Sequence, residues 1–293
     1  MEKRAFDIFT DSASDMPEEF FKENGITCLK LGYTLGDENY EGETDNKLAP
    51  KEFYERLAAG GMPTTTQVTG EMAKEYMRVS LEKGRDILVI AFSSALSGTA
   101  GSFIVAARDL SEEFPERKIR VVDSLNASMG EGLLLYYAMK KADEGASLDE
   151  TADYAEDLKL RICAHFTVDD LFHLKRGGRV SAATAAIGTM LKIKPIMHVS
   201  DEGKLIAIGK AMGRKKSLHT VVENLLRSAD MDETDPIFIT HGNCEDDIEY
   251  VKKLIWERMP NVKIYVNFVG AVIGSHSGCG TVALFNKGKS RNE

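Results

Sequence analysis

The sequence predicts an α/β protein of two domains, with a Rossmann-like parallel sheet in the N-terminal domain and a mixed sheet in the C-terminal domain. Short apolar runs alternate with helical patterns through the first half of the chain, as in a parallel sheet wound by helices. The second half contains two apolar runs joined by a turn sequence, which is typical of a hairpin and hence of a mixed sheet. A chain of 293 residues is also too long for one small core.

Three strand–loop–helix units are expected in the first half. Each begins with an apolar run that ends in a short loop of Asp, Ser or Thr residues. The strands are expected at residues 5–10, 87–92 and 121–122, and the helices that follow them begin near residues 17, 99 and 127. A further helix is expected at 148–160. Ligands of open parallel sheets bind beyond the carboxyl ends of the strands, where helix N-termini also point, so these loops are candidate binding loops.

The pattern changes near Arg161, where we place the domain boundary, giving domains 1–161 and 162–293. A strand is expected at 162–168, followed by a basic glycine loop at 175–179. The predicted hairpin pairs residues 195–200 with 204–208 around an Asp-Glu-Gly turn. The remaining expected elements are helices at 215–228 and 246–259 and strands at 237–240, 263–267 and 281–285.

Composition excludes several classes of protein. The chain has 37 Lys and Arg against 46 Asp and Glu, and a net charge of -9 repels a phosphate backbone, so nucleic acid is not an expected partner. No run approaches 18 apolar residues, so no membrane-spanning segment is expected. The cysteines are far apart in the sequence and predict reduced thiols in a cytoplasmic protein, with neither a metal site nor a disulfide; they are Cys28, Cys163, Cys244 and Cys279.

Five clusters of small polar residues stand out, and their order and spacing resemble the DegV family along nearly the whole chain. The clusters lie at residues 11–15, 63–67, 93–99, 175–179 and 276–281. The family's usual forms are an Asp-Ser-Thr/Ala turn, a Thr-Ser-Gln-Pro loop, a Ser-Ser-x-Leu-Ser-Gly-Thr loop, a Gly-Gly-Arg loop and a late His-x-Gly-x-Gly. This chain departs from them at Thr66, where the family usually has Ser, and at Val68, where it usually has Pro.

The resemblance implies a bacterial carrier that holds one long-chain fatty acid in a tunnel between its domains, with no cofactor and no catalytic residue. It also implies that Thr65, Ser97 and His276 hold the carboxyl group. The neighbouring residues expected at this site are Thr66, Ser94, Gly98, Thr99 and Gly278.

The residues themselves fit an anion site. Ser97 stands where a predicted strand leads into a helix, so its hydroxyl and the amides of Gly98 and Thr99 can face an anion. A buried carboxylate needs several donors, and His276 can supply a proton or a positive charge. Structural alternatives stay open, since a threonine run is typical of a surface turn and a lone histidine is often a core residue. The 11–15 cluster is expected to end a strand and cap a helix.

A basic cluster is unusual in so acidic a chain. In the resembling family, such arginines help to dock a kinase that phosphorylates the bound fatty acid for phospholipid synthesis. Arg176, Arg179 and Arg214 are the corresponding candidates here, although Met212 stands where the family often has Arg. A solvated basic face is the alternative.

Two enzyme classes remain as competing hypotheses. A serine esterase or lipase would use Ser97 with His276, but a nucleophile elbow needs glycines where Ala95 and Thr99 stand. A phosphotransferase would use the late glycine loop, but residues 274–281 lack the lysine of a P-loop. Binding without chemistry is therefore the favoured reading.

Overall fold

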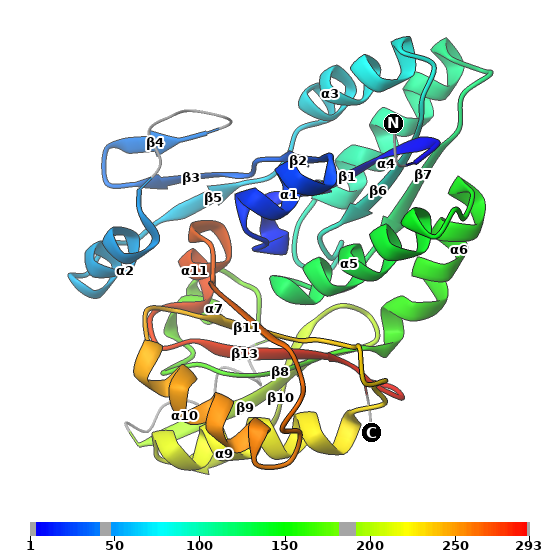
Figure 1. The fold of residues 1–293 in the computed structure, drawn as a ribbon. Helices are drawn as coiled ribbons and strands as arrows, with labels where there is room; N and C mark the ends of the chain where they lie inside the picture. The colour runs from blue at the N-terminus through cyan, green and yellow to red at the C-terminus, as the bar shows by residue number, and fades with distance from the viewer. Residues whose placement is uncertain (1–3, 42–47, 182–191, 292–293) are drawn as a thin grey trace.

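The computed structural model describes residues 4–41, 48–181 and 192–291, and the described residues form three sheets (Figure 1). The first sheet is fully parallel and has the strand order β2-β1-β6-β7. Its strands are β1 (Phe6–Asp11), β2 (Ile26–Leu29), β6 (Asp86–Ala91) and β7 (Ile119–Asp123). Parallel strands need long crossover connections, and helices make those connections here, as the alternating sequence pattern predicts.

Helices cover both faces of the parallel sheet. They are α1 (Glu18–Asn24), α3 (Gly70–Glu82), α4 (Thr99–Glu113), α5 (Met129–Asp143) and α6 (Leu148–Leu158). Successive residues of β6 point to opposite faces: Ile87 and Val89 share a core with α3 and α4, while Leu88 and Ile90 share one with α5 and α6. A strand buried on both faces has a continuous apolar sequence, and this is why β6 could be predicted from the sequence.

The second sheet is mixed and has the strand order β10-β9-β8-β13-β11-β12. Its strands are β8 (Ile162–Thr167), β9 (Ile193–Val199), β10 (Leu205–Met212), β11 (Ile237–His241), β12 (Ile264–Phe268) and β13 (Val282–Lys287). The predicted hairpin is confirmed, since β9 and β10 pair antiparallel. All strands of the parallel sheet precede Arg161 and all strands of the mixed sheet follow it, which supports the boundary that we propose at this residue.

One face of the mixed sheet packs on α9 (Arg214–Ser228) and α10 (Glu245–Trp256). Two short helices, α7 (Phe172–Arg176) and α11 (Ala271–Ser277), contact each other at the side of this domain that faces the N-terminal domain (Figure 1). The remaining short elements are the 3-10 turns η1 (Ser12–Ser14) and η2 (Lys159–Arg161).

Helix α5 joins the two domains. It packs on β6 of the parallel sheet and on β8, β11 and β13 of the mixed sheet (Figure 1). Because both sides are covered, its side chains are buried almost all round, as expected of a helix with no polar face. Among the described helices, this one included, none has the length and apolarity needed to cross a bilayer.

A small third sheet was not predicted. It has the order β4-β3-β5, with β3 (Gly32–Leu35), β4 (Glu38–Tyr40) and β5 (Thr64–Thr66), and helix α2 (Pro50–Ala58) precedes β5. The threonine run that resembles a surface turn is therefore a strand, in which Thr65 pairs with Tyr33. Strands of three or four residues are too short to show the alternation by which a strand is recognised.

Three carboxyl groups are buried where β1 ends. Asp11 caps η1 by accepting from the Ala13 amide at 3.0 Å, and it also accepts from the Phe92 amide at 2.9 Å, so the predicted capping role is confirmed. Burial raises the pKa of Asp11 and that of Asp15 to about 7. Burial, with the nearby charge of Asp11, raises the pKa of Glu131 well above its usual value. Oε1 of Glu131 accepts from Thr10 at 2.9 Å.

The substitution Glu131→Gln is expected to stabilise the protein increasingly as the pH rises. A folded-state pKa above the unfolded value means that folding takes up a proton, and this costs more free energy at each higher pH. Glutamine removes that cost, so the free energy of unfolding should exceed that of the wild type by about 1–3 kcal/mol at pH 8 and by much less near pH 5. Urea unfolding at both pH values measures the difference.

The exposed Glu19→Gln provides the control, because it removes a carboxylate from the surface. Comparing each variant with the wild type at the same pH cancels the opposite contribution of buried histidines such as His165, whose pKa burial lowers to about 3. A Glu131→Gln protein that is less stable than the wild type at pH 8 would contradict the account.

Candidate functional site

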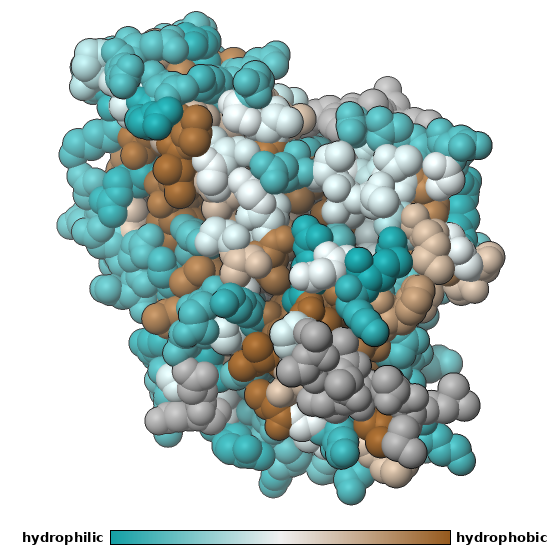
Figure 2. Space-filling view, turned by 180° about the vertical axis from the view of Figure 1, so that it is seen from behind, coloured by the Kyte–Doolittle hydropathy of each residue, from teal (hydrophilic) through white to brown (hydrophobic). Residues whose placement is uncertain are grey.

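A cavity lies between the two domains, with about 940 Å³ of space when the open solvent at its mouth is included. Loops that follow β2, β6 and β7 form one wall, and β8, β9, β10, β11 and β13 contribute the other. The expectation that ligand loops lie at the carboxyl ends of the parallel strands therefore agrees with the position of the cavity. Figure 2 shows hydrophobic residues reaching the surface between the two ends of the molecule, which are themselves mainly hydrophilic.

Most of the cavity wall is apolar. The side chains come from both domains and are aliphatic or aromatic; they include Leu31, Phe92, Leu96, Phe166, Leu174, Val199, Leu205, Val272, Ile273 and Phe285. Such a wall provides no hydrogen bonds, so it fits the hydrocarbon part of a ligand. The polar side chains that converge on the cavity therefore identify where a charged group can bind.

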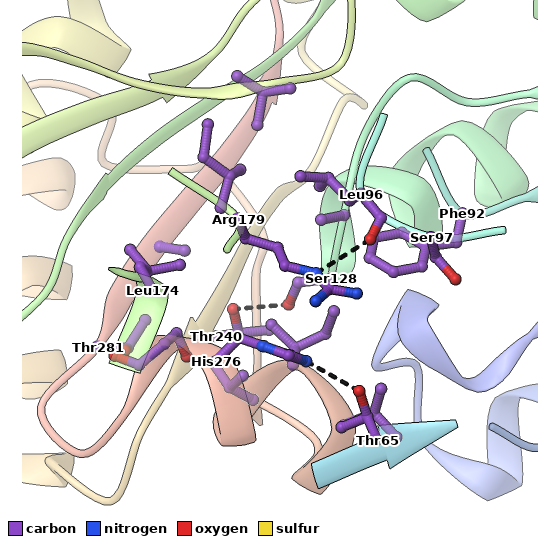
Figure 3. Close-up of a pocket in the computed structure, with 18 of the residues that line it drawn as sticks. Thr65, Phe92, Leu96, Ser97, Ser128, Leu174, Arg179, Thr240, His276 and Thr281 are labelled. Carbon is purple, nitrogen blue, oxygen red and sulfur yellow. Dashed lines mark hydrogen bonds between the residues drawn. The ribbon is translucent and has the colours of Figure 1, made fainter. Parts of the chain in front are cut away.

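Thr65 and His276 meet at the cavity (Figure 3). Oγ1 of Thr65, in β5, lies 2.9 Å from Nε2 of His276, in α11. Burial, together with the positive charges of Arg179 and Arg176, lowers the pKa of His276 to about 4. The imidazole is therefore neutral near pH 7 and acts through its ring N–H, whereas the sequence also allowed a positive charge. A bound anion would raise this pKa.

A glycine in the basic loop makes room for the imidazole. A Cβ atom at Gly177 would lie 2.1 Å from Nδ1 of His276, so any side chain here would displace the ring. Nδ1 itself is buried and has no hydrogen-bond partner among the described residues. Gly177 therefore helps to position the histidine, a role that its place between basic residues does not reveal in the sequence.

Ser97 lies in the loop before α4, as predicted. Its Oγ accepts from the Thr99 amide at 3.2 Å and lies 2.9 Å from Thr99 Oγ1. Gly98 also lines the cavity, and the side chain of Gln67 packs where its Cβ would be. Ser97 is thus held at the N-terminus of a 15-residue helix with its hydroxyl at the cavity, where the positive end of the helix favours an anion.

The structure brings five of the eight predicted ligand-binding residues to the cavity, namely Thr65, Thr66, Ser97, Gly98 and His276. The other three do not line it. Thr99 is fully buried behind Ser97, and Ser94 is exposed, with its amide donating to Asp123. Gly278 ends α11 with φ +82 and packs beside His173.

The three arginines predicted to dock a partner lie in different surroundings. Arg179 points into the cavity, where Nε donates to the Leu96 carbonyl at 3.2 Å (Figure 3). Arg176 donates to the carbonyls of Pro63 and Ser275, both at 3.0 Å, and so ties the loop before β5 to α11. Arg214 lies outside the cavity.

Arg214 forms an ion pair with Asp247 at 2.8 Å, and Asp169 lies 3.7 Å away. The cavity therefore contains one arginine, Arg179, close to the Ser97 loop. Sequence reasoning assigned Arg179 to a surface role because a basic residue beside glycines gives no sign of the direction in which its side chain points.

Two buried hydroxyl groups in the cavity were also missed. Ser128, before α5, and Thr240, in β11, lie 3.0 Å apart through their side-chain oxygens. They are 112 residues apart in the sequence. No local pattern links them, because their contact depends on how the domains pack. The one local signal is the position of Ser128 just after a strand-ending loop.

The chain matches a known protein family along nearly its whole length. The DegV family model matches residues 5–288. A DegV domain-containing protein of Clostridium perfringens is 42% identical over 288 residues, which cover 98% of this chain and 99% of the relative. A second DegV domain-containing protein, from Lactococcus lactis, is 34% identical over 98% of this chain and 99% of its own length.

Solved structures show the same two-domain fold. A fatty acid binding DegV family protein from Thermus thermophilus has a TM-score of 0.86 and 30% identity, covering 97% of this chain and 99% of that one. DegV of Bacillus subtilis, a fatty acid binding protein, has a TM-score of 0.83 and 28% identity, covering 98% of this chain and all of its own. The chain therefore belongs to the DegV family.

Proposed function

We propose that this protein binds one long-chain fatty acid in the cavity between its domains, without carrying out chemistry on it. The observation that carries the proposal is a largely apolar cavity on which Thr65, Ser97, His276 and Arg179 converge. DegV proteins of similar structure bind fatty acids, which supports the same class of ligand here. Mass spectrometry of the purified, denatured protein tests the proposal, because a bound acid would be released intact.

The four polar side chains that converge on the cavity meet the requirements of a buried carboxylate. An ionised carboxylate leaves water only where donors and a compensating charge replace its hydration. Thr65 and Ser97 supply hydroxyl donors, the neutral ring of His276 supplies an N–H, and Arg179 supplies the positive charge. The tail provides the larger share of affinity, since each buried methylene contributes roughly 0.8 kcal/mol before ordering costs.

The hydrogen bonds of Ser97 and His276 argue against an esterase. Ser97 Oγ contacts Thr99, whereas Nε2 of His276 contacts Thr65. A nucleophilic serine needs a base within hydrogen-bond reach and a third group that orients the base. Nδ1 of His276 has no such orienting partner among the described residues. A carrier needs neither arrangement, so binding remains the proposal.

We further propose that a separate fatty acid kinase phosphorylates the bound acid in the cytoplasm, for use in phospholipid synthesis. Exposed lysines beside Arg214 support an electrostatic docking surface, which we call the basic face and define by Lys192, Lys215 and Lys216. Arg176 and Arg179 are less suitable as docking residues, because their guanidinium groups bind carbonyls around the cavity. Arg214 remains a candidate at the edge of this face.

Charge reversal on the basic face is expected to slow kinase turnover without weakening fatty-acid binding. The variant Lys215→Glu/Lys216→Glu should lower the phosphorylation rate about tenfold at low salt, since charges at the edge of an interface act chiefly on the association rate. The defect should shrink as salt screens the attraction. A reconstituted assay with a cognate kinase at two ionic strengths measures it.

A matched control is Lys22→Glu/Lys83→Glu, which makes the same change of charge at exposed positions of the N-terminal domain. Arg214→Glu tests the ion-paired arginine separately. Equal phosphorylation rates at low salt for the wild type, Lys215→Glu/Lys216→Glu and Arg214→Glu would exclude the docking role and leave a solvated surface.

A further inference from the structure

Two hydroxyl groups in the cavity play no part in the site proposed for the carboxyl group. Ser128 and Thr240 line the cavity, and the two residues are 4% and 0% exposed. Their side-chain oxygens lie 3.0 Å apart, as the dashed line in Figure 3 shows. Each hydroxyl has one donor and two acceptor positions, so the pair can make a further hydrogen bond to a polar group in an otherwise largely apolar part of the cavity.

The pair is anchored on the buried carboxyl group of Asp15. Oγ of Ser128 lies 2.5 Å from Oδ2 of Asp15, and the Gly270 amide donates to Oδ1 at 3.0 Å. A hydrogen-bonded chain thus runs from Asp15 through Ser128 to Thr240 and crosses from one domain to the other. Ser277 adds a further buried hydroxyl to the cavity wall, and this hydroxyl has no partner among the described residues.

The direction of the hydrogen bonds that link Asp15, Ser128 and Thr240 determines what the Thr240 hydroxyl can bind in the cavity. When Asp15 is ionised it only accepts, so Ser128 donates to it, Thr240 donates to Ser128, and Oγ1 of Thr240 accepts from a ligand. When Asp15 is protonated the order reverses, and Thr240 donates to the ligand. Burial raises the pKa of Asp15, and Oγ of Ser128 is placed to donate to its Oδ2. A hydroxyl group can donate and accept, so it fits both states, whereas a ketone or ether only accepts.

We propose that Ser128 and Thr240 form a second polar subsite, which takes a hydroxyl group on the acyl chain and allows the protein to carry hydroxylated long-chain fatty acids. This inference rests on the proposed fatty-acid function. Because the carboxyl group would be held by Thr65, Ser97 and His276, the subsite lies at a fixed distance along the tail. It therefore matches the hydroxyl at one carbon, or at two neighbouring carbons, and at other positions the hydroxyl would be buried without a partner.

The test is a binding series of octadecanoic acids that carry one hydroxyl group at successive carbons, with stearic acid as the reference. For each protein, the affinity of each isomer is divided by the affinity of stearic acid. The wild type should bind one isomer, or two neighbours, at least about tenfold more tightly than the remaining isomers. Thr240→Val, which keeps the shape and removes the hydroxyl, should abolish this preference.

Two further variants support the comparison. Ser128→Ala should abolish the same preference, so the test survives if one variant fails to fold, which thermal unfolding would reveal. Thr220→Val, on α9 and outside the cavity, should leave the preference unchanged. A wild type that binds stearic acid but prefers no isomer, or a Thr240→Val protein that keeps the preference, overturns the subsite alone. A wild type that does not bind stearic acid overturns the fatty-acid function and the subsite with it.

Discussion

A protein carrying both Thr65→Val and Ser97→Ala is expected to bind long-chain fatty acids about a hundredfold more weakly than the wild type. Each substitution removes a hydroxyl donor from a buried carboxylate, a loss of about 1–3 kcal/mol, and 1.4 kcal/mol corresponds to a tenfold change in affinity. Binding should not vanish, because His276, Arg179 and the apolar wall remain. Displacement of a fluorescent fatty acid measures the affinity.

A matched control exchanges the same residue types in the same two segments. Thr64 and Ser94 are exposed and do not line the cavity, so Thr64→Val/Ser94→Ala should retain wild-type affinity. Circular dichroism shows whether each protein is folded. Undiminished affinity in a natively folded Thr65→Val/Ser97→Ala protein would show that the carboxyl group is held by other residues.

Replacing Arg291 with alanine is expected to destabilise the whole protein by about 3 kcal/mol or more, the scale of a lost buried hydrogen-bond network. Arg291 lies near the end of the described chain and is only 3% exposed. Its guanidinium group donates to five backbone carbonyls, which belong to Ser124, Leu125, Lys159, Ile162 and Ser200. These carbonyls come from both domains, so the arginine holds the domains together.

Alanine would remove all five hydrogen bonds at once. Ser200 and Ile162 would keep other donors, in the Gly203 amide and the Asn126 side chain, but the contacts that Arg291 makes to both domains would be lost. Lysine keeps the charge but cannot present the planar fork of donors, so Arg291→Lys should recover only part of the stability. Arg108→Ala, at a side chain that is 69% exposed and pairs with its neighbour Asp109, serves as the control and should change stability by less than about 0.5 kcal/mol. Urea unfolding measures all three. If Arg291→Ala lowers the free energy of unfolding no more than Arg108→Ala does, Arg291 does not hold the domains together.

The contrast between these two sites shows what sequence alone can predict. Ser97 was recognisable because its neighbours carry local signals: an apolar strand before it and a helix after it. The parallel sheet and the hairpin were predicted for the same reason, since their periodicity and turn residues lie within a few positions of each other. Arg291 carries no local signal, because its five partners lie 91 to 167 residues away along the chain.

The same limit explains which parts of the site were misplaced. Arg179 and Arg176 look alike in the sequence as basic residues beside glycines, yet one points into the cavity and the other ties α11 to the loop before β5. The neutral state of His276 also depends on tertiary structure, because burial and the two arginines lower its pKa. Sequence therefore identified loops that line the cavity, whereas the packing of the domains determines which side chains meet.

The most direct test of the central claim is mass spectrometry of the wild-type protein, purified from a bacterial host and analysed both under native conditions and after denaturation. We expect a native mass that exceeds the chain mass by that of one long-chain fatty acid, which is released on denaturation and reduced in amount in the Thr65→Val/Ser97→Ala protein. A native mass equal to that of the bare chain, unchanged after incubation with palmitic, stearic and oleic acids, would contradict it.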